Sequence, residues 1–226
     1  MTKHRRGVRM NLESAKSIGG VGAILVFIGG LAFFVQPLLT LGLGVLGALL
    51  VLISLHTLAH DYMEKGIFSN GLYGFITFVV GGIVSFAGFI YLFFYTSYVN
   101  DLVSVLYPGF NGDWTNLPNL QVNSNVNPAD IVPFLGPIIA ILVVTWIFII
   151  VGSFFTWRAM KHMSAKSSVG LFSTAGLLML IGAIIPIIGL VLVWIALLLI
   201  AIAFFQIKPQ PEQPMATMAP PPSTAV

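Results

Sequence analysis

The chain has 226 residues, of which 58% are hydrophobic and only 8% are charged. Soluble domains carry about 25% charged residues, so this composition excludes a soluble globule and indicates a protein of the lipid bilayer. The net charge is +3 and there is no cysteine, which excludes disulfides, thiolate metal sites and thiol nucleophiles. We therefore expect an all-α, polytopic bundle of transmembrane helices.

The N-terminal segment 1–17 is basic and holds five of the ten Lys and Arg residues, namely Lys3, Arg5, Arg6, Arg9 and Lys16. So many positive charges cross a membrane poorly, which predicts that this end is cytoplasmic. We interpret the segment as a topology signal; a patch specific for lipid or nucleic acid is the alternative, and we expect no nucleic-acid partner.

Six apolar segments without Lys or Arg are expected to cross the membrane within 18–208: 18–35, 38–58, 72–95, 133–157, 169–185 and 187–207. Pro37 separates the first two, and Pro133 and Pro137 suit the first turns of the fourth. As a single helix, 171–207 would be roughly 55 Å long, well beyond a hydrocarbon core of about 30 Å. We therefore predict a hairpin broken near Pro186 and Gly189.

An even number of spans puts both termini and all ten basic residues on the cytoplasmic side of the plasma membrane. Merging the last two spans into one would leave Lys208 outside. The loop 98–130 then lies outside; it has no Lys or Arg, and 100–107 is typical of a short amphipathic helix. The loop is either a recognition surface or a disordered connector. The Pro-rich tail 209–226 is expected to be extended or disordered.

His56 and His60 stand four residues apart, a spacing that can place two imidazoles on one helical face toward a metal ion. His162 could be a third ligand if the fold brings the two cytoplasmic loops together. Without further ligand signals the simpler interpretation is a helix end at the headgroups. We expect no resident metal and no cofactor.

Small residues four apart mark faces where two helices can approach closely. They are Gly19 with Ala23, Gly44 with Ala48, and Gly81 with Ser85. Their partner is either another helix of this chain or another subunit. Ionisable residues, which coupled transport of charged solutes needs near mid-membrane, are missing from the spans, and hydroxyl residues there more often bond their own helix or a neighbour.

The segment 14–17 (SAKS) recurs as 164–167, and 22–29 resembles 176–182 with one gap. Each copy precedes a Gly-rich helix, a proline near a turn and a second helix. We therefore expect a repeated helical hairpin formed by the first and last pairs of spans. Chance similarity between apolar segments is the alternative.

Short motifs of the chain resemble an uncharacterised archaeal membrane family, the domain of unknown function 996. The motifs are Ser17 to Gly22, Asp61-Tyr62 with Ile67-Phe68, Gly170 to Phe172, Thr174 to Gly176, Ile181-Gly182 and Ala201 to Phe205. The resemblance runs from Ser14 to Lys208. It implies a membrane location and brings no activity.

No nucleophile elbow, hydrolytic pair of carboxylates or phosphate-binding glycine loop is present, so we expect no enzyme. The leading hypothesis is an accessory or structural subunit that packs against partner membrane proteins or copies of itself. The alternative is a passive channel or facilitator for small neutral or lipophilic solutes, which a polar face shared by several spans would support.

Overall fold

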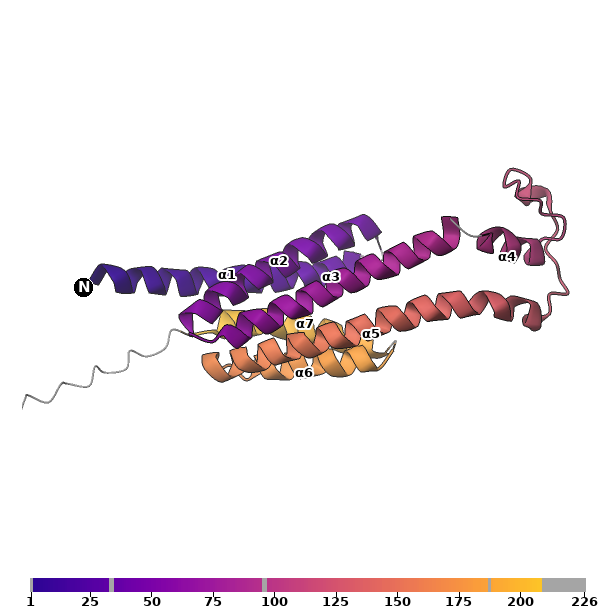
Figure 1. Ribbon diagram of the computed structural model, residues 1–226. Helices are drawn as coiled ribbons and strands as arrows, with labels where there is room; N and C mark the ends of the chain where they lie inside the picture. The colour runs from indigo at the N-terminus through magenta and orange to yellow at the C-terminus, as the bar shows by residue number, and fades with distance from the viewer. Residues whose placement is uncertain (1, 33–34, 95–96, 187, 209–226) are drawn as a thin grey trace, which may run out of the picture.

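The computed structural model describes residues 2–32, 35–94, 97–186 and 188–208, with side chains from Leu12 onward except that of Pro37. The described chain is helical, without a strand (Figure 1). Its long helices are α1 (Thr2–Ala32), α2 (Pro37–Asp61), α3 (Lys65–Phe94), α5 (Pro128–Ser167), α6 (Leu171–Ile184) and α7 (Ile188–Gln206). A short helix α4 (Tyr98–Leu106) and a 3-10 turn η1 (Leu117–Asn119) lie in the loop. The expected all-α fold is confirmed.

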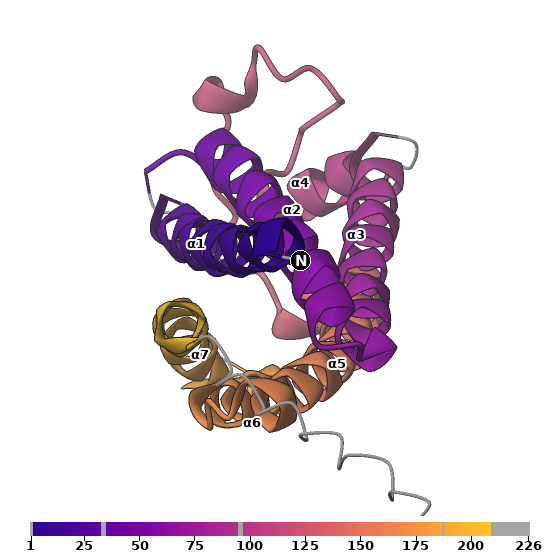
Figure 2. The same ribbon diagram turned by 90° about the vertical axis from the view of Figure 1, so that its left-hand side faces the viewer.

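The six long helices stand side by side in a ring, which Figure 2 shows end on. Around the ring α1 contacts α2, α2 contacts α3, and α3 contacts α5. The ring continues through α6 and α7, and α7 packs back onto α1. In a membrane the outer face of each helix can stay in contact with lipid, because lipid tails are as apolar as the side chains. Only the faces toward the two neighbouring helices need to pack.

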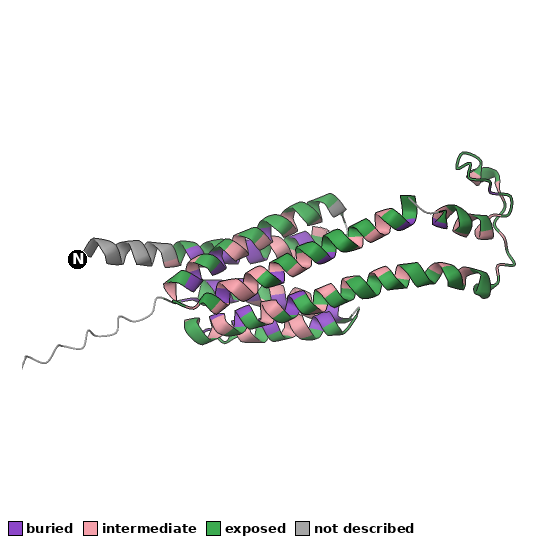
Figure 3. Cartoon of the chain, in the orientation of Figure 1, coloured by how far each residue is buried: buried purple, intermediate pink, exposed green. Residues whose placement is uncertain are grey.

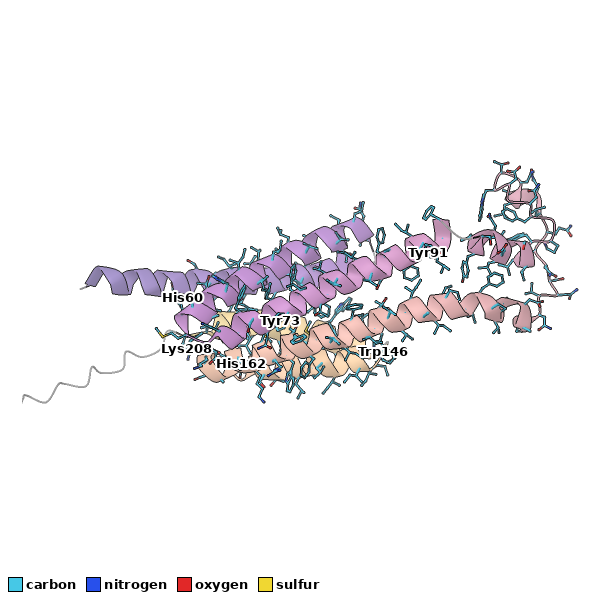
Figure 4. The ribbon with its side chains drawn as sticks, viewed as in Figure 1. His60, Tyr73, Tyr91, Trp146, His162 and Lys208 are labelled. Atoms are coloured by element: carbon cyan, nitrogen blue, oxygen red, sulfur yellow. The ribbon has the colours of Figure 1, made fainter. Side chains whose placement is uncertain are left out.

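The two ends of the ring differ in the residues that they carry. His60, His162 and Lys208 lie at one end, and Tyr91 lies toward the other (Figure 4). We name the first the basic end; the second, which carries α4 and the loop, is the loop end. The buried core lies in the half near the basic end (Figure 3), where the rings of Phe172 and Phe204 meet edge to face at 5.1 Å.

Five of the described helices, α1, α2, α3, α5 and α7, are long and apolar enough to cross a membrane. The sixth apolar helix, α6, has 14 residues, about 21 Å, which is short of a hydrocarbon core of about 30 Å. The expected span 169–185 is therefore shorter than predicted. The predicted break between the last two helices is confirmed, because α6 ends at Ile184 and α7 begins at Ile188.

The two prolines and the glycine assigned to hairpin breaks have different roles. Pro37 is the first residue of α2, and Pro186 lies in the turn between α6 and α7. Gly189 instead lies in the first turn of α7, where an added Cβ would overlap the backbone of Gly182. Gly189 therefore allows α7 to approach α6, and the break itself includes Ile185 and Pro186.

Helix α5 begins earlier than the sequence predicted. The Asn127 side chain caps it by accepting a hydrogen bond from the Ala129 N–H at 3.0 Å, and Pro128 is its first residue. A capping asparagine followed by proline is a strong start signal, so the helix forms before Pro133 is reached. Pro133 and Pro137 lie inside α5, and the prediction that they occupy its first turns is wrong.

Candidate functional site

The small residues predicted to mark packing faces are mostly used inside the chain. Gly19 faces the Ser54 hydroxyl and the Phe204 ring, and Ala23 is 1% exposed. An added Cβ on Gly81 would lie 2.5 Å from Phe148 Cβ. The other members are Ser85, which pairs with Thr145 of α5 at 2.6 Å, Ala48, which lines a cavity, and Gly44, whose Cβ position has nothing within 4 Å.

The closest approach between α1 and α2 involves glycines outside those pairs. A Cβ added to Gly47 would lie 2.5 Å from the Gly22 carbonyl oxygen, and one added to Gly22 would lie 2.7 Å from the Gly47 carbonyl oxygen. Two backbones in direct contact leave no room for a side chain at either position. Gly22 and Gly47 were missed because spacing within one helix does not give the register between two.

A cavity of about 170 Å³ lies at the centre of the ring. All six helices contribute to its wall: Ala23, Val26, Ala48, Val51, Leu52, Leu55, Gly71, Phe75, Phe78, Thr156, Met160, Met179, Leu197 and Ile200. Among these lining residues Thr156 carries the one polar side chain, and its hydroxyl donates to the Gly152 carbonyl in its own helix at 2.9 Å. An apolar cavity of roughly this size stays dry and can hold a small apolar molecule.

The three histidines considered as metal ligands are split between two places. His56 and His60 line one hollow at the basic end together with Lys65, and the His56 ring meets the Phe68 ring edge to face at 4.8 Å. His162 instead faces Glu64, with 3.7 Å between its Nδ1 and the carboxylate. Within the described residues no three His, Cys, Asp or Glu side chains gather as metal ligands would.

Hydroxyl groups in the spans mostly bond their own helix, as expected. The Thr77 hydroxyl donates to the carbonyl four residues earlier. Of the paired Ser85 and Thr145 hydroxyls, one donates to the other, which in turn donates to the carbonyl four residues earlier in its own helix. The Ser54 hydroxyl crosses to α1 and donates to the Ala15 carbonyl at 2.7 Å. Thr40 Oγ1 is buried with no hydrogen-bond partner among the described residues. These groups stabilise the helices and form no continuous polar face.

Both helical hairpins stop short of the loop end. The Trp146 indole N–H of α5 donates to the Ala183 carbonyl near the end of α6 at 2.7 Å. About 27 Å of α5 lies between Trp146 and Pro128, beyond that contact. On the other side of the ring Gly30, near the end of α1, lies against the Trp194 indole of α7. The tips of the two hairpins are therefore near one level, and α3 and α5 continue past them as a pair (Figure 1).

The part of the α3–α5 pair beyond the hairpins, 86–94 with 128–145, is named here the extended pair. Its apolar side chains are widely exposed: Phe86 67%, Phe94 79%, Val132 60%, Ile139 53% and Leu142 53%. The two helices hold each other, since Gly88 faces Ile141 and the Tyr98 hydroxyl at the start of α4 donates to the Phe134 carbonyl. The two helices of the pair are thus packed against each other, while the apolar side chains on their outer faces are exposed.

The loop that joins α3 to α5 is ordered in the described residues. The predicted amphipathic helix is confirmed as α4 (Tyr98–Leu106), and the Asn123 N–H donates to the Leu106 carbonyl at 2.8 Å. In the turn before η1, the Asp113 carboxylate accepts from the Thr115 hydroxyl at 2.6 Å and from its backbone N–H at 3.0 Å. These hydrogen bonds favour the charged form and lower the pKa of Asp113.

The ring of apolar helices defines the class: an integral membrane protein built as a helical bundle. A family model described as "Protein of unknown function (DUF996)" matches residues 43–203. The chain belongs to this family. The match begins in α2, so the motif Ser17 to Gly22 lies outside it. No curated protein and no solved structure matches the chain.

Proposed function

We propose that the protein is a non-catalytic subunit that packs against partner membrane proteins through the extended pair. The observation that carries the proposal is the exposure of apolar side chains on α3 and α5 where these two helices extend beyond the tips of the other four. Single exposed apolar residues need no explanation, but a long apolar pair beside two hairpin tips leaves a hollow that another membrane helix can fill.

The tips of the hairpins support a protein neighbour. Val35 is 84% exposed and Ile188 is 69% exposed, and Gln36 is exposed between α1 and α2. A side-chain amide near apolar surface is stabilised when a neighbouring helix supplies a hydrogen-bond partner. We propose as occupant an apolar transmembrane helix with one polar side chain at the level of Gln36, from another subunit or a second copy.

The same proposal includes an orientation. Both termini and the basic end face the cytoplasm of a plasma membrane, and the loop 98–130 faces outside, because the basic residues outside the spans gather at one end. We also propose that the source is archaeal, as the family resemblance implies. Since the chain has no native cysteine, Asn116→Cys should react with an impermeant thiol reagent on intact cells. Labelling only after lysis would refute this orientation.

The packing proposal is tested by photo-crosslinking in the source membrane. A photoreactive residue at Ile139 or Phe86 should form a discrete adduct with one protein, which mass spectrometry then identifies. The matched controls are Leu177 on α6 and Leu198 on α7, which are each 45% exposed but lie on the six-helix part. Adducts with lipid alone at Ile139 and Phe86 would exclude a protein partner on the extended pair.

A second candidate function is supported by the central cavity. An apolar chamber reached by all six helices fits a binding protein or facilitator for small lipophilic molecules better than a polar channel, because Thr156 adds little polarity. Ala48→Phe places a large ring in the cavity and should abolish binding of a small apolar probe such as xenon in the purified protein. Unchanged xenon binding would remove this candidate.

A further inference from the structure

A second hollow at the basic end, of about 790 Å³, gathers three lysines from separate parts of the chain. Lys16 comes from α1, Lys166 from the end of α5, and Lys208 from the residues after α7. The remaining lining residues are Ser167, Ser168, Val169, Gly170, Phe205, Gln206 and Ile207. We name this hollow the lysine pocket; no acidic residue lines it.

The sequence repeat explains two of the three lysines. Lys16 and Lys166 occupy the same position in the two SAKS segments, and the fold brings both to one pocket. The surroundings of the two copies differ: the first continues within α1, whereas the second ends α5 before Ser168, whose φ is 58°. Both segments therefore contribute a lysine to the lysine pocket, although a helix ends after the second segment and not after the first.

The charges around the pocket leave it positive. Lys166 Nζ lies 3.4 Å from the Glu64 carboxylate, and Lys16 Nζ lies 3.6 Å from that of Glu13. Neither acid lines the pocket, and the Glu13 side chain is 69% exposed, so solvent weakens its attraction. The first turn of α6 begins at the Gly170 wall and adds its positive dipole end.

Local contacts hold the pocket in shape. The Ser54 hydroxyl bonds the carbonyl of Ala15, next to Lys16. The Ser167 hydroxyl donates to the Met163 carbonyl at 2.7 Å, which fixes the residue after Lys166. Ile207, next to Lys208, is 2% exposed and anchors the end of α7 in the core. All three lysines therefore extend from backbone that is fixed by its neighbours.

We propose that the lysine pocket binds the phosphate headgroup of an anionic phospholipid from the leaflet at the basic end. Three ammonium groups around a hollow, two of them with a carboxylate nearby, attract the single negative charge of a phosphodiester, and basic pockets between helices at a membrane face bind such headgroups. An apolar track leads from the pocket along α7: Phe205, Ile202 and Leu198 follow at helical spacing and are 50%, 40% and 45% exposed. The acyl chains lie along this track.

The test uses the purified full-length protein and native mass spectrometry with added phosphatidylglycerol. The triple change Lys16→Gln, Lys166→Gln and Lys208→Gln should weaken binding roughly a hundredfold, because each lysine that lines the pocket and contacts the headgroup contributes about fivefold. The matched control is Lys65→Gln, Arg158→Gln and Lys161→Gln, which removes the same charge from the same end and should change binding less than about twofold. Circular dichroism checks that both variants fold.

Two results would overturn the proposal. Equal weakening in the triple variant and its control would mean that net charge, and not the lysine pocket, attracts the lipid. Inorganic phosphate or chain-free glycerophosphoglycerol that binds as tightly as phosphatidylglycerol would identify a soluble ligand and exclude the lipid source. If the triple variant does not fold, Lys208→Gln alone, at an exposed residue after α7, should still weaken lipid binding about fivefold, and no change would refute the pocket.

Discussion

The contact between α1 and α2 makes a sharp prediction about two glycines on one helix. Gly47→Ala should destabilise the protein, because its Cβ would lie 2.5 Å from the Gly22 carbonyl oxygen. Gly44→Ala, three residues away, should be neutral or stabilising, because nothing lies within 4 Å of its Cβ position. Comparing the two variants also separates two interpretations of the contact with α1. The spacing of small residues predicts that Gly44 lies at this contact, whereas the structure places Gly47 there.

The size of the effect follows from the distance. A carbon and a carbonyl oxygen in contact are about 3.3 Å apart or more, so α1 and α2 must separate by about 0.8 Å. A gap of that size forfeits a quarter to a half of each atomic contact, or roughly 2–4 kcal/mol over some tens of contacts. Alanine recovers up to about 1 kcal/mol through its higher helix propensity. The net loss for Gly47→Ala is about 2 kcal/mol.

The assay is unfolding of the detergent-solubilised protein by increasing sodium dodecyl sulfate, followed by circular dichroism. Gly47→Ala should lower the midpoint, whereas Gly44→Ala should leave it unchanged or raise it by an amount equivalent to at most about 1 kcal/mol. Equal midpoints for the two variants would show that the backbones of α1 and α2 do not touch at Gly47. The reverse order would support the register inferred from residue spacing.

Three further predictions test other contacts. Trp146→Phe removes the hydrogen bond to the Ala183 carbonyl and should cost about 1 kcal/mol in the same assay. Glu64→Gln should change stability by less than about 1 kcal/mol, because both of its ion-pair partners are more than a third exposed. The pKa of Asp113 is lowered by Thr115, so its turn is stabilised above the ordinary value near 3.8 and loosens as pH falls through the lowered pKa. The protection factor of the Thr115 amide against hydrogen exchange should fall there, and Asp113→Asn should remove that fall.

The lysine pocket and the extended pair concern opposite ends of the molecule, and their tests are independent. The pocket needs Lys16, Lys166 and Lys208 and a lipid, while the extended pair needs exposed apolar side chains and a protein neighbour. Loss of lipid binding with intact crosslinks at Ile139 would support the pocket without weakening the packing proposal. Unchanged lipid binding in the lysine variant, together with intact crosslinks at Ile139, would support the partner alone.

Much of the fold could be predicted because it depends on local signals. Composition indicates a membrane protein, the runs of apolar residues give the helices, and the break before α7 follows from a stretch too long for one crossing. The amphipathic pattern of 100–107 likewise gives α4. The early start of α5 could also have been predicted, since Asn127 and Pro128 form a helix start signal. Our prediction began this helix at Pro133 instead, because proline also favours a first turn.

The tertiary structure alone decided which residues meet. Spacing within a helix selects a face, but it does not give the register or depth of the neighbouring helix, so Gly47 was missed and Gly189 was assigned to a break. Charge patterning placed Lys16 and Lys208 at one end of the molecule, yet only ring closure between α7 and α1 brings them to one pocket. The sequence by itself determined that the chain forms apolar helices, because helix formation in a membrane depends on each segment's own transfer from water to lipid. The cavity, the extended pair and the lysine pocket depend on contacts between distant segments, which only the folded ring defines.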